Sequence, residues 1–414
     1  MISLQDPWEE RLNSAAFAAL LVCWSALAFA PALVEIAFGV SVGLWLLSVL
    51  RVRRFPLEEL NLQARLCLLG YLLIVIFSYF WSEYPSQSFR GFFKVLQQVM
   101  LFILTADLLN RRSRFTWFER VTLATFTVIV IDGFWQYLML RDFLRGYAAA
   151  DSTAGPRLSA SFKSYGLLAN YLICVLPVAA GIVLTRMKPN SKLRVLLLVV
   201  AGAGLLLLIN TRSRGAIMSF AASMFLILLI RKRYLMVLCF IAAMGTLLLI
   251  LPRNMIVHRD INKREQSLVE RYHLWDRALQ VVKAKPLTGT GINTYTVSHA
   301  RYDKKGNARV RGYYAHNGYL QAAAETGIPS MVCLLGFFAL LFRQSWQLSS
   351  RDGPRTPLYF GILAGLFSFF IFMGVDTVFH NPASSRLFWI MLGLLHAFAY
   401  YDRAQTRAST ASEV

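Results

Sequence analysis

Two arginines stand in a short polar segment, Asn210–Gly215, between two long apolar runs. The guanidinium groups of Arg212 and Arg214 are planar forks that bind phosphate oxygens through paired hydrogen bonds. The apolar run that follows is expected to begin as a helix here, and a helix N-terminus adds partial positive charge. The segment therefore predicts a site for an anion such as a diphosphate. The alternative is that both side chains extend from the end of a membrane helix towards the lipid headgroups.

A histidine stands where another polar segment enters an apolar run. An imidazole titrates near neutral pH, so His316 at this boundary can act as a general base. Tyr313 and Asn317 flank it as candidates for supporting roles. Glu325 lies about two and a half helical turns further along, where an ionisable side chain is costly in lipid and predicts a function. The alternatives are a solvated or capping histidine, and a glutamate that only pairs with an arginine.

Three further polar side chains belong to segments that could meet the first two. Arg157 precedes another apolar run and is a candidate third ligand for the anion. Asp376 and His380 lie in a turn between the last two runs, where they either pair with these groups or cap helix ends. The five cysteines all lie in or beside apolar segments and show no metal-ligand spacing. We expect no metal and no cofactor.

The long segment 253–316 is basic, with 13 Lys or Arg against 5 Asp or Glu. Within it, Gln266–Lys285 has helical periodicity, with Arg271 and Arg277 off a stripe of apolar residues. That stripe consists of Leu268, Tyr272, Trp275, Leu279 and Val282. The pattern predicts an amphipathic helix at a membrane surface, ended by the turn-rich Pro286–Gly291.

All these residues need an apolar scaffold, and the composition supplies one. Hydrophobic residues make up 57% of the 414 residues and charged ones only 16%, and several apolar runs are long enough to cross a bilayer. The fold class is therefore all-α, a polytopic integral membrane protein of one membrane domain over residues 1–414. We expect twelve spans, with 253–316 as the loop between the ninth and tenth: 15–33, 34–50, 64–82, 92–110, 117–140, 165–186, 193–211, 215–230, 234–252, 317–342, 358–377 and 384–401.

Basic clusters orient these spans. Each cluster follows an even-numbered span, beginning at Arg51, Arg111, Arg186, Arg231, Arg343 and Arg403. The positive-inside rule then puts all six clusters and both termini in the cytoplasm. This leaves 141–164, 210–215, 253–316 and 376–383 on the outer face. They contain the candidate residues apart from Asn317 and Glu325, which lie in the tenth span. The net charge of +21 is explained by topology signals and anionic lipid or ligand, and not by nucleic acid.

Four short patches, in this order, resemble the O-antigen ligase/polymerase superfamily of bacterial membrane glycosyltransferases. They are Arg157-Leu-Ser-Ala-Ser-Phe, Ser213-Arg-Gly, Arg271-x-x-x-Trp275 with Pro286 and Gly289-x-Gly291, and His316-Asn-x-x-Leu320 with Glu325-x-Gly327. The span layout and the long outer loop are similar as well, which implies a GT-C-like membrane fold. The segment before the sixth span departs from the family pattern, since Ala160 stands where a glycine is frequent.

The resemblance implies a metal-independent, inverting glycosyltransferase. Its donor would be an undecaprenyl-diphosphate-linked glycan, and its acceptor a hydroxyl on lipid A-core, as in a ligase, or on a second lipid-linked glycan, as in a polymerase. His316 would activate the acceptor hydroxyl. Arg214 and Arg271 would hold the diphosphate, with Arg157 and Arg212 beside them. The location implied is the bacterial inner membrane, in contact with its lipids.

Two other classes compete with this hypothesis. A transporter or flippase for lipid-linked sugars also suits twelve spans, but it would usually place charges at mid-membrane and repeat its halves. Here the polar residues gather on one face. A scaffolding protein gives no reason for arginines and a histidine to converge on the outside.

Overall fold

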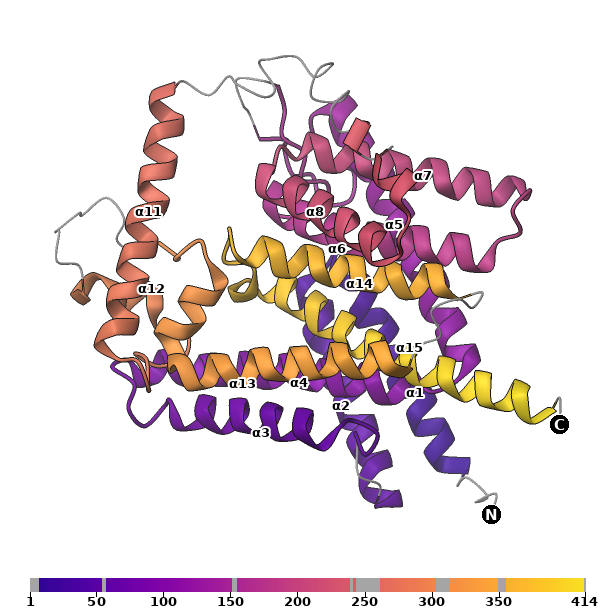
Figure 1. The fold of residues 1–414 in the computed structure, drawn as a ribbon, viewed down its shortest axis with the longest axis horizontal. Coiled ribbons are helices and arrows are strands. Elements are labelled where there is room, and N and C mark those ends of the chain that lie inside the picture. Colours follow the sequence, from indigo (N-terminus) through magenta and orange to yellow (C-terminus); the bar gives the residue numbers. More distant parts are fainter. Residues whose placement is uncertain are drawn as a thin grey trace.

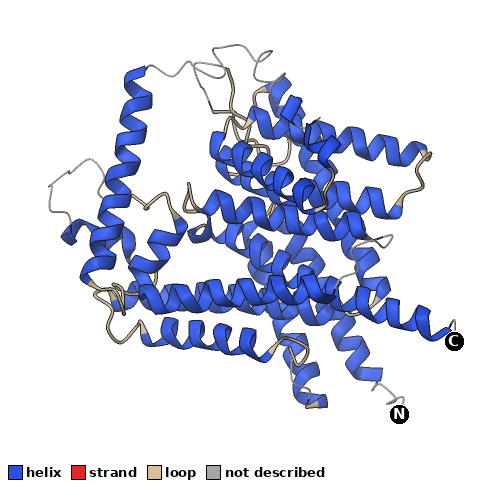
Figure 2. Cartoon of the chain, in the orientation of Figure 1, coloured by secondary structure: helices blue, strands red, loops and turns tan. Residues whose placement is uncertain are grey.

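The computed structural model describes residues 7–53, 57–150, 155–238, 241–242, 261–302, 313–348 and 355–412. In this part of the chain the structure is helical (Figures 1 and 2), and the only pairing of extended backbone is two isolated bridges in the connection 140–164. The helices are α1 Pro7–Ala26, α2 Pro31–Val52, α3 Leu62–Phe77, α4 Pro85–Leu108, α5 Arg112–Met139, α6 Tyr165–Arg186, α7 Lys192–Asn210, α8 Arg214–Ile230, α11 Ile261–Ala284, α12 Tyr295–Ser298, η1 His299–Tyr302, α13 Gly318–Leu348, α14 Thr356–Met373, η3 Val378–His380 and α15 Pro382–Ser412.

Each predicted span apart from the ninth overlaps one of these helices, although the first was predicted at 15–33 and α1 ends at Ala26. Of 234–252, only 234–238 and 241–242 lie within the described residues, and they are helical. By length and composition, seven described helices can cross a membrane, namely α2, α4, α5, α6, α7, α13 and α14, and α3 and α8 are shorter apolar helices. The prediction of an all-α, polytopic membrane protein is confirmed.

The helices α6 and α14 lie at the centre of the bundle and approach each other closely. A Cβ atom added to Gly361 would lie 2.4 Å from the carbonyl oxygen of Pro177, and one at Gly365 would lie 2.3 Å from that of Cys174. Small residues four apart allow such contacts, which hold membrane helices together by close packing. Around this pair, α14 also packs on α8, α15 on α4, and α13 on α3. The helix ends that carry the candidate residues are thereby fixed in place.

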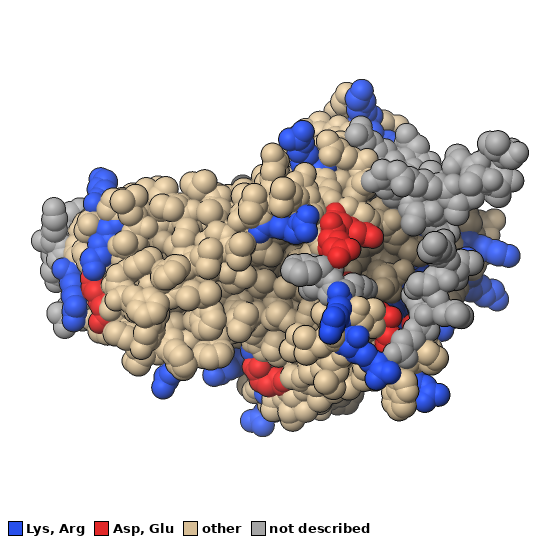
Figure 3. All heavy atoms as spheres, turned by 90° about the horizontal axis from the view of Figure 1, so that it is seen from below, with Lys and Arg blue, Asp and Glu red and all other residues tan. Residues whose placement is uncertain are grey.

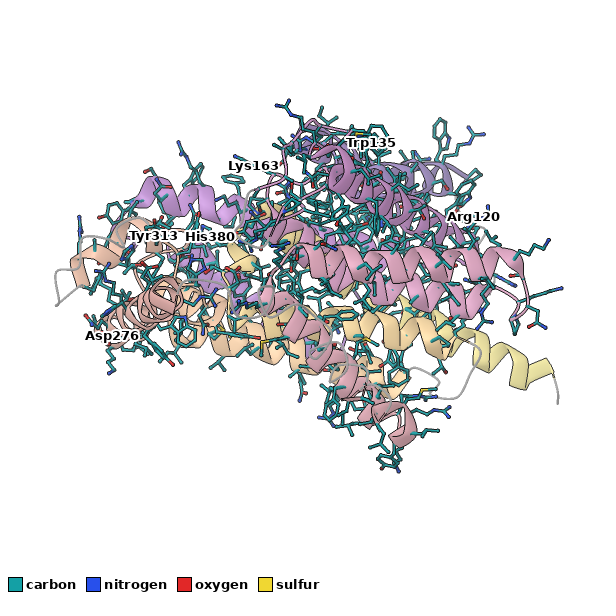
Figure 4. All side chains as sticks on the ribbon, turned by 90° about the horizontal axis from the view of Figure 1, so that it is seen from above. Arg120, Trp135, Lys163, Asp276, Tyr313 and His380 are labelled. Atoms are coloured by element: carbon teal, nitrogen blue, oxygen red, sulfur yellow. The ribbon has the colours of Figure 1, made fainter. Side chains whose placement is uncertain are left out.

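The bundle has two distinct ends. The start of α1 and the end of α15 lie at one end, whereas α11 and α12 lie at the other (Figure 1). The face seen in Figure 3 carries a wide stretch with few charged residues between its charged ends, as expected of a surface covered by lipid. In Figure 4, Tyr313 and His380 lie at the α11 end and Arg120 lies at the opposite end. We call the α11 end the outer end.

Helix α11 covers the segment where the sequence predicts an amphipathic helix, and it runs across the outer end of α13 (Figure 1). Its packed face, however, differs from the prediction. Leu274, Ala278 and Val281 are buried, whereas Tyr272 and Leu279 of the predicted stripe are exposed.

Arg277 lies off the predicted stripe, as expected, but its side chain is only 2% exposed. The reason is that α11 has two apolar faces. One packs on α13 and on Tyr295 of α12, and the other, with Tyr272 and Leu279, is exposed.

Candidate functional site

His316 lies at the junction between the outer segment and α13. The side chain of Asn317 caps α13, because its Oδ1 accepts hydrogen bonds from the backbone N–H groups of Tyr319 and Leu320, each at 3.1 Å. The backbone of His316 has a φ of 48°, and its carbonyl accepts a hydrogen bond from the indole Nε1 of Trp275 at 3.4 Å. The backbone of His316 is therefore held between the helix cap at Asn317 and Trp275 of α11.

The imidazole of His316 pairs with Asp376, which lies in the turn after α14. Nδ1 of His316 is 3.1 Å from Oδ1 of Asp376, and each side chain is more than a third exposed. The backbone N–H of Thr377 donates to the same carboxylate oxygen at 2.7 Å and orients it. A carboxylate at Nδ1 favours the tautomer that carries its proton there. The lone pair of Nε2 is then available to accept a proton.

Arg271 and the start of α8, which carries Arg214, both contact this turn. Nη1 of Arg271 donates to the carbonyl oxygen of Val375 at 3.3 Å. Arg214 is the first residue of α8 and is exposed, and its neighbour Gly215 packs so closely that a Cβ there would lie 3.1 Å from a methyl group of Val375. Arg271 and the start of α8 are far apart in the sequence, yet both contact the turn that contains Val375 and Asp376. The two segments that carry Arg214 and Arg271 therefore lie next to the His316–Asp376 pair.

Arg157 and Arg212 lie next to this arrangement but are engaged differently. Arg157 donates to the carbonyl oxygens of Thr211 at 3.3 Å and Arg212 at 3.4 Å, and its guanidinium lies 3.4 Å from the ring centroid of Tyr165. Arg212 has a φ of 54° in the α7–α8 turn, and partial burial lowers the pKa of its guanidinium. These contacts fasten the 155–165 segment to the start of α8. The prediction that the two side chains also bind an anion stays a prediction.

Glu325 lies in α13, where a kink at Gly327 interrupts the helix. Its carboxylate is 3% exposed and accepts hydrogen bonds from the backbone N–H groups of Asn293 at 2.8 Å and Tyr295 at 3.2 Å. It also accepts one from Nε2 of Gln321 at 3.2 Å. An ionisable group buried here is satisfied by backbone donors, so its observed contacts tie the outer segment to α13.

Gly291 and Gly327 belong to the last two of the four sequence patches. They allow the loop after α11 to pack closely against α13 and the α3–α4 connection, in a contact that we call the interlock. Gly291 has a φ of 108°, and a Cβ there would lie 2.3 Å from Oγ of Ser82 in the α3–α4 connection. The N–H of Gly291 donates to the carbonyl oxygen of Glu325 at 2.8 Å. On the other side of that connection, Lys285 forms an ion pair with Glu83 at 2.6 Å. The loop after α11 is thereby anchored to both α13 and the α3–α4 connection.

Replacing Gly327 should show how much this interlock matters for stability. Its φ is 80°, and a Cβ would lie 2.3 Å from the carbonyl oxygen of Leu287, so Gly327→Ala combines backbone strain with a clash. We expect a loss of about 2–4 kcal/mol in the free energy of unfolding. Thermal unfolding of the full chain in nanodiscs should show a lower melting temperature. Gly43→Ala is the control, since nothing lies within 4 Å of its added Cβ. Equal melting temperatures for Gly327→Ala and the unaltered chain would contradict this account.

Gln321 connects these groups and was not found from the sequence. Its Oε1 accepts from the backbone N–H of Ala315 at 3.2 Å, and its Nε2 lies 3.0 Å from Nδ1 of His380. Burial, together with the nearby Lys94 amine, lowers the pKa of His380 to about 4, so this imidazole is neutral at pH 7. The ring of His380 also packs against Tyr314, 4.7 Å between centroids. Tyr313, in contrast, is 54% exposed at the outer end (Figure 4).

The described side chains of this site do not form a set of metal ligands. Across the described ranges, no group of three or more His, Cys, Asp or Glu side chains is arranged to hold a metal ion. Four of the five cysteines lie in that part of the chain, and they are free thiols in or beside the apolar interior. The groups that the site offers are instead cationic guanidinium groups, one imidazole and carboxylates.

The fold and site define a multi-pass helical membrane protein with a polar site at one end of its bundle. Comparison with known proteins indicates which family it resembles. Residues 195–335 match the family described as O-antigen ligase, which includes Arg212, Arg214, Arg271, His316 and Glu325. A second match is 26% identical over 125 residues to the exopolysaccharide production protein ExoQ of Rhizobium meliloti (strain 1021). Over these residues the chain is similar to members of the O-antigen ligase/polymerase superfamily.

These matches cover part of the chain. The alignment with the Rhizobium protein spans 28% of this chain and 29% of that protein. Arg157 lies before the family match, and Asp376 and His380 lie after it. The contact between Asp376 and His316 is therefore a feature that the structure adds to the matched region.

Proposed function

We propose that this protein transfers a glycan from undecaprenyl diphosphate to a sugar hydroxyl at the outer face of the bacterial inner membrane, in the manner of an O-antigen ligase. The observation that carries the proposal is that Arg271, the start of α8 with Arg214, and the His316–Asp376 pair all lie at the turn after α14. Cations suit a diphosphate, and a base suits a hydroxyl. The whole chain acts as one membrane domain, with both termini in the cytoplasm and 253–316 in the periplasm.

The proposed reaction is a single displacement. The acceptor oxygen attacks the anomeric carbon, the bond from that carbon to the phosphate oxygen breaks, and undecaprenyl diphosphate leaves with the electron pair. Nε2 of His316 takes the proton of the hydroxyl. Attack opposite the leaving group inverts the configuration at the anomeric carbon.

Three groups of this chain support that displacement without a metal ion. Arg271 and Arg214 neutralise the charge that grows on the leaving diphosphate. Asp376 holds the imidazole in the required tautomer and stabilises it once it is protonated. The site lies at a helix end beside an apolar bundle, so the polyprenyl chain of the donor can remain in the lipid while its diphosphate reaches the arginines.

The same chemistry serves a polymerase, which is the alternative proposal. The name of the Rhizobium protein, exopolysaccharide production protein, favours a growing polysaccharide as acceptor. The family description favours ligation. The donor site is common to both, and the difference lies in the acceptor alone.

One experiment tests both proposals. Purified protein in nanodiscs is given labelled undecaprenyl-diphosphate glycan, with either lipid A-core or a second lipid-linked glycan as acceptor, with and without EDTA. We expect a new glycosidic bond, formed with inversion and unaffected by EDTA; the productive acceptor separates ligase from polymerase. Transfer that EDTA abolishes would exclude metal independence. If sealed vesicles show the donor crossing the bilayer and neither acceptor gains sugar, the protein is a flippase.

A further inference from the structure

A cavity lies directly behind the His316–Asp376 pair. Gly318 and Thr377, which lie two residues and one residue away from that pair, form part of its wall. The rest comes mainly from α4, α13, the 292–293 segment and η3. The polar side chains of the wall include Lys94, Gln98, Asn293, Gln321, Ser330 and His380, together with Glu325 and Thr377. The cavity was not visible in the sequence, because its wall joins residues from distant segments.

Three wall residues carry buried polar atoms with no hydrogen-bond partner in the part of the chain that the structure describes. They are Oε1 of Gln98, Oγ of Ser330 and Oγ1 of Thr377, on side chains that are 7%, 0% and 9% exposed. Buried polar groups are nearly always paired, and leaving one unpaired is costly. Three such atoms around one cavity indicate that they form hydrogen bonds with a bound ligand.

The wall chemistry fits an uncharged, hydroxyl-rich guest. The hydroxyl groups of Ser330 and Thr377 and the amide oxygen of Gln98 can each form a hydrogen bond with an alcohol, because an alcohol both donates and accepts. The amine of Lys94 is already directed at Oδ1 of Asn293, 3.0 Å away, and the Glu325 carboxylate also borders the cavity. Amide and carboxylate oxygens disfavour an anion. Val95, Met331 and Phe379 supply apolar wall, as in most pockets for small ligands, and suit the C–H faces of a sugar ring.

We propose that this cavity binds the acceptor sugar, the ring that carries the attacking hydroxyl, and this inference rests on the proposed function. Arg271 contacts the turn at Val375, and the start of α8, which carries Arg214, packs on the same residue, whereas Thr377 lines the cavity. Asp376, the partner of His316, lies between Val375 and Thr377 in the chain. A sugar seated in the cavity therefore presents its hydroxyl from the side opposite the diphosphate. In-line displacement requires that arrangement of nucleophile and leaving group.

Kinetics of the full chain in nanodiscs test this inference. The donor is the labelled undecaprenyl-diphosphate glycan, and the varied acceptor is a lipid-free oligosaccharide released by mild acid from the producing cell's own surface polymer. We expect Ser330→Ala and Gln98→Leu each to raise the KM for the acceptor about tenfold, the loss of one hydrogen bond, with the KM for the donor unchanged. Because the Ser330 hydroxyl has no described partner, Ser330→Ala should not lower the melting temperature.

Ser48→Ala is the matched control. Its hydroxyl is equally buried and lacks a described partner, but it lies on α2 outside the cavity wall. It should leave both KM values unchanged. An unchanged acceptor KM in both cavity variants would overturn the inference and mean that the cavity holds only water, and a raised donor KM would assign it to the donor glycan. If the unaltered protein makes no glycosidic bond at all, the proposed function itself has failed.

Discussion

Replacing His316 with alanine should abolish most of the transfer while leaving donor binding intact. A positioned general base typically contributes about 10²–10⁴-fold to the rate, so kcat should fall by that range in His316→Ala. The KM for the donor should change little, because the cations that would bind the diphosphate lie on other segments. Single-turnover transfer with labelled donor measures the chemical step, and filter binding of the same donor measures its affinity.

The control variants separate a base from a structural residue. His316→Gln keeps a polar side chain near Asp376 but supplies no base, so it should lose as much activity as alanine. Asp376→Asn keeps the shape of its partner and should lose less, since the imidazole remains. The melting temperature of all three should stay close to that of the unaltered chain, because both side chains are more than a third exposed. A His316→Ala protein with full transfer rate would remove the base from the mechanism.

The sequence is informative where a pattern is local. Runs of apolar residues predict the helices because membrane spans need about twenty such residues each, whatever their neighbours. The helix cap at Asn317 is equally local. These features depend on residues close in sequence or on the alternation of spans, so the structure agrees with them.

Other parts of the site depend on contacts between distant segments, which no local sequence pattern predicts. From the sequence alone, Asp376 could either pair with one of the site residues or cap a helix end. Only the approach of the turn after α14 to the start of α13 brings it to His316. The buried face of α11, with Leu274, Ala278 and Val281, was not predicted, because it is defined by packing on α13 and on Tyr295. The cavity behind the pair joins α4, α13 and η3, which no spacing rule connects.

Removing the guanidinium groups at the outer end should have the second large effect. Arg271→Gln and Arg214→Gln should each lower kcat/KM for the donor by about 10²–10³-fold, as expected when a fixed donor to a developing negative charge is lost. The two effects should not simply multiply, because both side chains would contact one diphosphate. Binding of undecaprenyl diphosphate alone, without a glycan, should weaken in both variants, and this links the loss to the leaving group.

Ionic strength provides the decisive readout for these arginines. Attraction between guanidinium groups and a diphosphate is screened by salt, so the donor affinity of the unaltered chain should fall as salt rises, and the variants should show a shallower slope. A merely structural role, through the contact of Arg271 with the Val375 carbonyl, would lower activity without changing that slope. Arg120→Gln, at the opposite end of the bundle (Figure 4), removes the same charge and should match the unaltered chain. Salt slopes that stay parallel in Arg214→Gln and Arg271→Gln would show that neither side chain holds the diphosphate.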